Sequence, residues 1–203
     1  MSVNLQKGQK VELRKSGGGT LRRVMVGLGW DEAPAQKSGG LFSALFGSPK
    51  QNAIDCDASA FVCVNGRLNS NKDIIYFGHL IHETHAVEHM GDNLTGEGEG
   101  DDEQIAVNLE ALPVQYDKIV FVVNIYQAQE RGQNFGMIRN AFIRIIDTDT
   151  NQELCRYSLS DDYQGMTAMV FGEIYRHNGE WKFNAIGQGT SDLDIKSLAR
   201  RFS

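Results

Sequence analysis

The sequence has little proline, little cysteine and no long apolar run. Of its 203 residues, 3 are proline and 3 are cysteine. An odd number of cysteines without CxxC spacing fits free thiols in a reducing compartment. No stretch approaches the ~20 apolar residues that a transmembrane helix needs, and the N-terminus has no apolar signal-peptide region. We therefore expect a cytoplasmic protein with no membrane span.

The sequence also lacks a basic excess and the common catalytic motifs. Its net charge is -6, with 26 acidic and 20 basic residues, which argues against nucleic-acid binding. Gly-x-Ser-x-Gly is absent, and no Gly-Lys-Ser/Thr follows Gly27-Leu-Gly-Trp. We predict no catalytic residue and no organic cofactor, and we expect that the protein is not an enzyme.

The dominant hydrophobic period is two, which is typical of strands. Residues 118–126 form a β-branched and aromatic run. We expect one hairpin whose turn is Asn178-Gly179. A second hairpin is expected around the polar turn at residues 147–152. Short strands with frequent turns predict an all-β sandwich or barrel. Further strand-like runs lie at residues 10–13, 21–27, 58–64, 73–77, 141–146, 153–159 and 168–176.

Two segments depart from the β pattern. Residues 32–53 contain Gly39-Gly40 and two prolines, and we interpret them as a loop insertion. The apolar patch at residues 41–46 is either a turn packed on the body or an exposed docking patch of an adaptor protein. At the C-terminus, apolar residues repeat at helical spacing behind Ser191-Asp192, which predicts a short amphipathic helix over about 192–202.

The segment from Gly91 to Glu103 is rich in carboxylates and glycines. It holds six carboxylates, four glycines and a single apolar residue, Leu94. Carboxylates this close repel one another, and a hard cation would neutralise them. Calcium binds 6–8 oxygens from carboxylates, amides and backbone carbonyls. The segment predicts a calcium site, with a solvated acidic loop as the alternative.

A second acidic element supports the metal interpretation. Asp55 and Asp57 are two residues apart at the start of a predicted strand, so both should point to the same face. Two carboxylates on one face are poor core material but suitable cation ligands. Asp31, which follows Gly27-Leu-Gly-Trp, is a weaker third contributor.

Histidines gather in a short segment. His79, His82, His85 and His89 suit zinc or copper better than calcium. His82-Glu83-Thr84-His85 is one residue shorter than HExxH, in which the histidines are four apart on a helix. We interpret the segment as a solvated polar hairpin tip, with a His-site metal-dependent hydrolase as the alternative.

Seven motifs together resemble the TerD family of bacterial tellurite-resistance and stress-response proteins. They are Leu5-Gln-Lys-Gly-Gln, Val26-Gly-Leu-Gly-Trp-Asp, Asp55-x-Asp-Ala-Ser-Ala-Phe, the acidic segment of residues 87–103, Gln133-Asn-Phe-Gly, Arg139-Asn-Ala-Phe-Ile-Arg, and the segment of residues 171–183. The resemblance covers about residues 2–190 and implies one TerD-like domain over residues 1–203. It also implies a C2-like antiparallel β-sandwich that binds calcium and has no enzymatic activity.

The resemblance further implies a ligand set and partners. The expected partners are other tellurite-resistance proteins, among them a TerC-like membrane protein that would bring the chain to the inner face of the membrane. This sequence departs from the family in the insertion, in the His-rich segment and at Cys56, where leucine is common. The implied metal ligands are Asp31, Asp55, Asp57, Asp92, Asn93, Glu97, Glu99, Asp101, Asp102 and Glu103.

Overall fold

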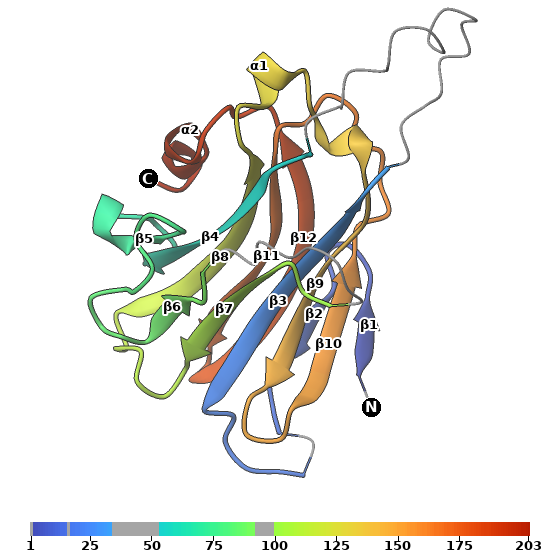
Figure 1. The fold of residues 1–203 in the computed structure, drawn as a ribbon. Coiled ribbons are helices and arrows are strands. Elements are labelled where there is room, and N and C mark those ends of the chain that lie inside the picture. Colours follow the sequence, from blue (N-terminus) through green and yellow to red (C-terminus); the bar gives the residue numbers. More distant parts are fainter. Residues whose placement is uncertain (1, 16, 34–52, 92–99) are drawn as a thin grey trace, which may run out of the picture.

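The computed structural model describes residues 2–15, 17–33, 53–91 and 100–203. Two six-stranded sheets pack face to face, and Figure 1 shows them as the two layers of a sandwich. Sheet A has the order β1-β10-β9-β3-β7-β6. Its strands are β1 (Val3–Leu5), β3 (Arg23–Glu32), β6 (Val87–His89), β7 (Glu103–Asn108), β9 (Ile138–Asp147) and β10 (Gln152–Ser158).

Sheet B has the order β2-β12-β11-β8-β4-β5. Its strands are β2 (Lys10–Glu12), β4 (Cys56–Val64), β5 (Ile74–Ile75), β8 (Tyr116–Ile125), β11 (Ala168–His177) and β12 (Glu180–Thr190). The short helices are α1 (Ala128–Arg131), α2 (Ile195–Ala199) and three 3-10 turns at Asn71–Asp73, Phe135–Met137 and Arg200–Phe202.

The main core lies between the sheets and follows strand alternation. In β3, Val24, Val26 and Leu28 are fully buried and face sheet B. Phe121 and Phe171 contribute large side chains to the same cluster from sheet B. Fully burying an aliphatic side chain stabilises the fold by about 1.5–3 kcal/mol, so this alternation determines which face of each strand points inward.

A second core lies on the outer face of sheet B, where the C-terminal helix covers it. Leu198 of α2 is fully buried, and the ring of Phe202 packs edge-on against Phe61 of β4 with 5.6 Å between centroids. Figure 1 shows α2 lying beside the sheet on this side. Because both faces of β8 are covered, its central residues 119–123 are continuously apolar rather than alternating.

The predicted all-β two-sheet fold with a short C-terminal helix is confirmed. The hairpin at Asn178-Gly179 is also confirmed, since both residues adopt positive φ angles of 54° and 81° between β11 and β12. The prediction of the residue that caps the helix was wrong. Asp194, not the Ser191-Asp192 pair, accepts a hydrogen bond from the Ser197 N–H and completes a capping box with the Ser197 side chain.

Two other expectations need correction. The sheets are not wholly antiparallel, because β1 pairs with β10 in parallel. The strand expected at residues 73–77 contains only Ile74 and Ile75, because a 3-10 turn occupies residues 71–73. The insertion expected at 32–53 and its apolar patch at 41–46 fall almost entirely outside the described residues.

Candidate functional site

The two acidic segments meet where β4 and β7 begin. The side chain of Glu103 is buried, and its Oε2 accepts a hydrogen bond from the Ala58 N–H at 2.6 Å. Strand β5 pairs only with Ala60 and Phe61, so this part of the β4 edge has no strand partner in the described residues. Glu103 therefore takes the place of a neighbouring strand for one backbone donor and connects sheet A to sheet B.

His89 forms the second contact of this carboxylate. Its Nδ1 accepts a hydrogen bond from the Gly91 N–H at 3.1 Å, which leaves the ring proton on Nε2. Nε2 lies 3.3 Å from Oε2 of Glu103, and the His89 side chain is fully buried. Burying a carboxylate is costly unless it is hydrogen-bonded, and the Ala58 N–H and His89 together offset that cost. We assign Glu103 an anchoring role between the two sheets.

Asp102 lies one residue earlier, against the end of β3. Its Oδ2 accepts a hydrogen bond from the Trp30 N–H at 2.6 Å. Burial raises the pKa of Asp102, and the nearby negative charges of Asp31 and Asp101 raise it further, against the Trp30 hydrogen bond. Asp31, in β3 rather than in a loop, accepts a hydrogen bond from the Asn140 side chain at 2.8 Å. Asp31 of β3 and Asp102, the residue before β7, thus both add negative charge to this region.

The carboxylate of Asp101 forms an ion pair with Arg144. The Asp101 side chain is fully buried, and Oδ1 accepts a hydrogen bond from Arg144 Nε at 2.7 Å while Oδ2 accepts one from Gln104 at 2.9 Å. The carboxylate rests on Gly27, where a Cβ atom would come within 2.2 Å of the Asp101 Cγ. Asp101 can ligate calcium only by exchanging Arg144 for the ion.

The Gly27-Leu-Gly motif of β3 is explained by these contacts. Gly27 and Gly29 lie on the outer face of sheet A, opposite the buried side chain of Leu28. A Cβ atom on Gly29 would come within 2.5 Å of the Phe142 ring. The two glycines therefore make room for a buried carboxylate and an aromatic ring, and they bind no phosphate in this arrangement.

The Asp55-x-Asp57 pair flanks the first residue of β4. Cys56 is buried in the core between the sheets, whereas Asp57 lies on the outer face of sheet B, as strand alternation predicts. Asp55 precedes the strand, and its backbone oxygen accepts a hydrogen bond from the Tyr126 N–H. The side chain of Asp55 is 53% exposed and lies 3.8 Å from Arg131.

Four of the described candidate carboxylates lie near one end of the sandwich. Asp31, Asp55, Asp57 and Asp102 come from three segments near the starts of β4 and β7 and the end of β3. Among the described residues, no group of three or more His, Cys, Asp or Glu side chains is arranged to hold a metal ion. Calcium needs 6–8 oxygens, so further donors are required. The remaining predicted ligands, Asp92, Asn93, Glu97 and Glu99, lie outside the described residues.

The interpretation of the histidine segment as a solvated tip was wrong for two of its members, His82 and His89, which are buried. His82 is fully buried, with Nε2 3.2 Å from Asp73 and Nδ1 accepting a hydrogen bond from the Thr84 N–H. The ring of His82 also packs edge-on against Tyr116. His82 and His89 each face a separate carboxylate, so within the described chain they do not converge on one metal. These pairings, and the Arg144 counter-ion, were missed because nothing local in the sequence marks a partner so distant along the chain.

No helix in the described residues is long and apolar enough to cross a membrane.

Comparison with known proteins gives consistent matches. The family model for the TerD domain matches residues 1–202. The chain is 48% identical over 202 residues to "Stress response protein SCP2" of Bacillus subtilis (strain 168), covering 100% of both chains. It is 46% identical over 190 residues to "Tellurium resistance protein TerD" of Serratia marcescens, covering 93% of this chain and 91% of the relative.

A solved structure has the same fold. The crystal structure of a homologue of telluride resistance protein (TerD) from Streptomyces coelicolor A3(2) superposes with a TM-score of 0.63 at 20% identity, covering 91% of this chain and 99% of that one. At this identity the match establishes the fold alone.

Proposed function

Since the chain belongs to the TerD family of tellurium-resistance and stress-response proteins, we propose that it is a calcium-binding, non-enzymatic member of such a system. The observation that carries the calcium proposal is the negative charge of Asp31 and Asp101 near the Asp102 carboxylate. Burial raises the pKa of Asp102, and the neighbouring carboxylates raise it further, although the Trp30 N–H donates to it. A divalent cation at this point would remove the repulsion between carboxylates.

The connection between the segments supports the same proposal. Glu103 fixes the start of β7 against β4, so the carboxylates of the two acidic segments are held in one region. Arg144 and Arg131 each lie beside one of the six described candidate carboxylates, Asp101 and Asp55 respectively. Asp31, Asp57 and Asp102 are not arranged around one point in the described structure, so we propose that calcium draws them together with donors from residues 92–99.

Calorimetry on the full chain, after removal of metal with a chelator, tests the calcium proposal. We expect calcium to bind more tightly than magnesium, because many carboxylates on a loop suit a large and irregular coordination sphere. At free calcium ~100 times the dissociation constant, the native state gains about 2.7 kcal/mol. This gain raises the melting temperature by roughly 5–11 °C. If calcium produced no heat of binding and no change in melting temperature, the calcium proposal would fail. The adaptor alternative, in which the acidic segment has only a structural role, would then be favoured.

Two substitutions at the DxD segment sharpen this test. Asp57→Asn should weaken calcium binding, because it removes one charge and leaves the side-chain volume unchanged. Cys56→Leu should leave calcium affinity nearly unchanged, since Cys56 faces the core, although the larger side chain costs about 1–3 kcal/mol of stability. Equal losses of calcium affinity from both variants would contradict the proposed geometry.

The partners form a separate proposal with its own test. We propose that the calcium-bound protein binds other tellurite-resistance proteins in the cytoplasm, including a TerC-like membrane protein. A pull-down with purified candidates, in calcium and in chelator, should capture a partner more strongly in calcium. The hydrolase alternative would instead require retained zinc and hydrolysis that depends on His79, His82, His85 and Glu83.

A further inference from the structure

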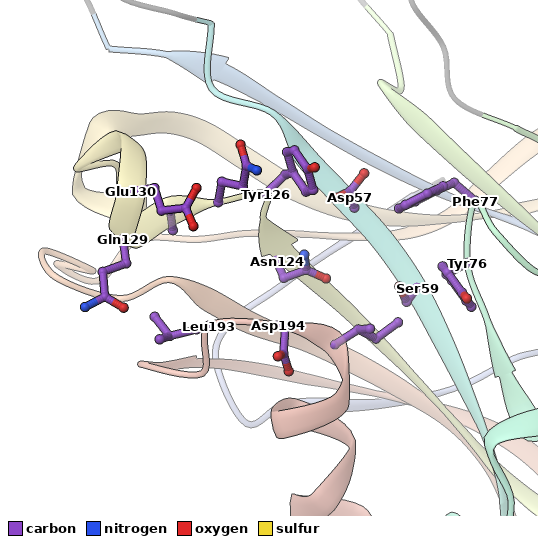
Figure 2. A pocket seen from close by; sticks show the side chains of 13 residues that line it. Asp57, Ser59, Tyr76, Phe77, Asn124, Tyr126, Gln129, Glu130, Leu193 and Asp194 are labelled. Atoms are coloured by element: carbon purple, nitrogen blue, oxygen red, sulfur yellow. The ribbon is translucent and has the colours of Figure 1, made fainter.

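A pocket of about 370 Å³ lies on the outer face of sheet B, beyond the region that α2 covers. Its walls come from β4, from the end of β8, from α1 and from the residues that lead into α2. Figure 2 shows Asp57 and Ser59 between Tyr126 on one side and Tyr76 and Phe77 on the other, with Asn124 between Tyr126 and the segment that holds Leu193 and Asp194. The volume is within the usual range for small-molecule sites.

The floor of the pocket is polar, whereas the neighbouring part of this face, under α2, is apolar. Asp57 and Asn124 are paired across β4 and β8, and Asn124 is only 8% exposed. Ser59 follows Asp57 on the same face and is 1% exposed, and its Oγ has no hydrogen-bond partner within the described structure. An unsatisfied buried polar group costs about 1–3 kcal/mol. A ligand that hydrogen-bonds to Ser59 would recover this cost.

Aromatic side chains flank the floor and are largely exposed. Phe77 is 53% exposed and packs edge-on against Tyr76, and Tyr126 is 44% exposed. Leu193, across the pocket, is 49% exposed. The ring of Tyr126 already accepts one cation, since the Arg131 guanidinium lies 5.1 Å from its centroid. Aromatic faces attract ammonium and guanidinium groups, so these walls suit a cation with an apolar body.

The charged side chains in the described lining of the pocket are all acidic, and a described cation, Arg131, lies beside them against Tyr126. The described lining includes three carboxylates, Asp57, Glu130 and Asp194, and no lysine, arginine or histidine. Hydrogen bonds from Ser197 lower the pKa of Asp194, which keeps it ionised at neutral pH. A phosphate or carboxylate ligand would be repelled, whereas a cation would be attracted from solution.

We propose that this pocket binds a small organic cation that carries a primary ammonium group on an apolar or aromatic body. The ammonium has three N–H donors, and the floor offers three acceptors in the Asp57 carboxylate, the Ser59 hydroxyl and the Asn124 carbonyl oxygen. The body of the ligand packs between Phe77, Tyr126 and Leu193. This proposal does not depend on the calcium proposal, and Asp57 is the one described residue that the two sites have in common.

The test is an NMR titration of the full-length protein in phosphate buffer with chelator, because Tris is itself a primary ammonium. Benzylammonium is the probe, and benzyl alcohol, benzoate and benzyltrimethylammonium are the comparisons. We expect amide shifts to change at residues 57–59, 124–130 and 193–195. Affinity should be about tenfold or more higher for benzylammonium than for benzyl alcohol, since its hydrogen bonds are charge-assisted.

Variants that leave the calcium candidates intact complete the test. Ser59→Ala and Phe77→Ala should each weaken benzylammonium binding by roughly fivefold or more, and Val114→Ala, an 83% exposed site outside the pocket, should not. Equal binding of benzyl alcohol would overturn the cation assignment. Equal binding of benzyltrimethylammonium would overturn the hydrogen-bonding floor, and the absence of shifts at these residues would overturn the site itself.

Discussion

Glu103, the first residue of β7, accepts a hydrogen bond from the backbone N–H of Ala58 in β4, across 2.6 Å and from one sheet to the other. Sandwich layers are usually held together by apolar packing, and here a buried carboxylate adds a polar connection. It lies at the place where the two acidic segments come together. The connection therefore links the stability of the sandwich to the geometry of the proposed calcium site.

Replacing Glu103 should destabilise the protein even without calcium. Glu103→Ala leaves the Ala58 N–H and the His89 Nε2–H without their acceptor, at about 1–3 kcal/mol for each group. Urea unfolding in chelator should show a loss of about 2–5 kcal/mol in the free energy of unfolding. The matched control is Glu110→Ala, whose side chain is 64% exposed and lies 3.7 Å from Arg22. Similar losses in the two variants would refute the anchoring role.

Adjacent carboxylates should respond differently to removal of their charge. Asp101→Asn weakens a buried ion pair with Arg144, so stability should fall by about 1–3 kcal/mol with little change in calcium affinity. Asp102→Asn keeps an acceptor for Trp30 and relieves repulsion from Asp31, so stability in chelator should hold or rise.

Calcium affinity should fall about tenfold or more in Asp102→Asn, which corresponds to a loss of about 1.4 kcal/mol. Calorimetry and chelator melts on both variants measure the two effects. The opposite pattern would mean that Asp101 leaves Arg144 to bind the ion.

Gly27→Ala tests the contact between β3 and Asp101. The added Cβ would come within 2.2 Å of the Asp101 Cγ, so the carboxylate must leave Arg144. We expect a stability loss of about 1–3 kcal/mol. Gly17→Ala is the control, because a Cβ atom added at Gly17 would meet no described atom within 4 Å. Combining Gly27→Ala with Asp101→Ala should cost less than the sum of the single losses, since both act on the same contact.

The three thiols should be unreactive in the folded protein. Burial raises the pKa of Cys63 and Cys155 to about 12 and raises the pKa of Cys56 as well. At pH 8, about one part in ten thousand of such a thiol is thiolate. Iodoacetamide at pH 8 should label the native protein very slowly and all 3 cysteines of the denatured chain rapidly.

The raised pKa values of the three thiols also make the stability of the fold depend on pH. A raised pKa means that the folded state retains the proton more firmly than the unfolded chain. The stabilisation is fully present below the unfolded pKa of about 8.5 and is lost as pH rises towards 12. Rapid native labelling at pH 8 would contradict the burial of these residues.

The strands that could be predicted are those in which local pattern and packing agree. Residues 119–123 are apolar on both faces because β8 lies between the main core and the C-terminal helix. Asn178-Gly179 fixes a tight turn through backbone geometry alone. The strands β1, β6 and β7 were not expected, because they are short and polar residues interrupt each of them. They form through pairing with partners distant in the sequence, as Val3 does with Cys155.

The candidate site was only partly predictable for a related reason. Strand alternation correctly placed Cys56 and Asp57 on opposite faces of β4. Residue type alone could not distinguish Asp101, Asp102 and Glu103, which are consecutive carboxylates with an arginine, a backbone donor and a histidine as their respective partners. The partners lie on other strands, so their assignment required the tertiary structure.

The N-terminal pairing described above has a consequence for aggregation. Residues 3–5 cover the edge of β10 in sheet A, and residues 10–12 cover the edge of β12 in sheet B. One short segment thus protects an edge of each layer. Exposed strand edges are templates on which a second copy of a chain can add its own strand. A cut or displacement within the first dozen residues would uncover two such templates together, so proteolytic trimming there would make this protein self-associate rather than simply loosen.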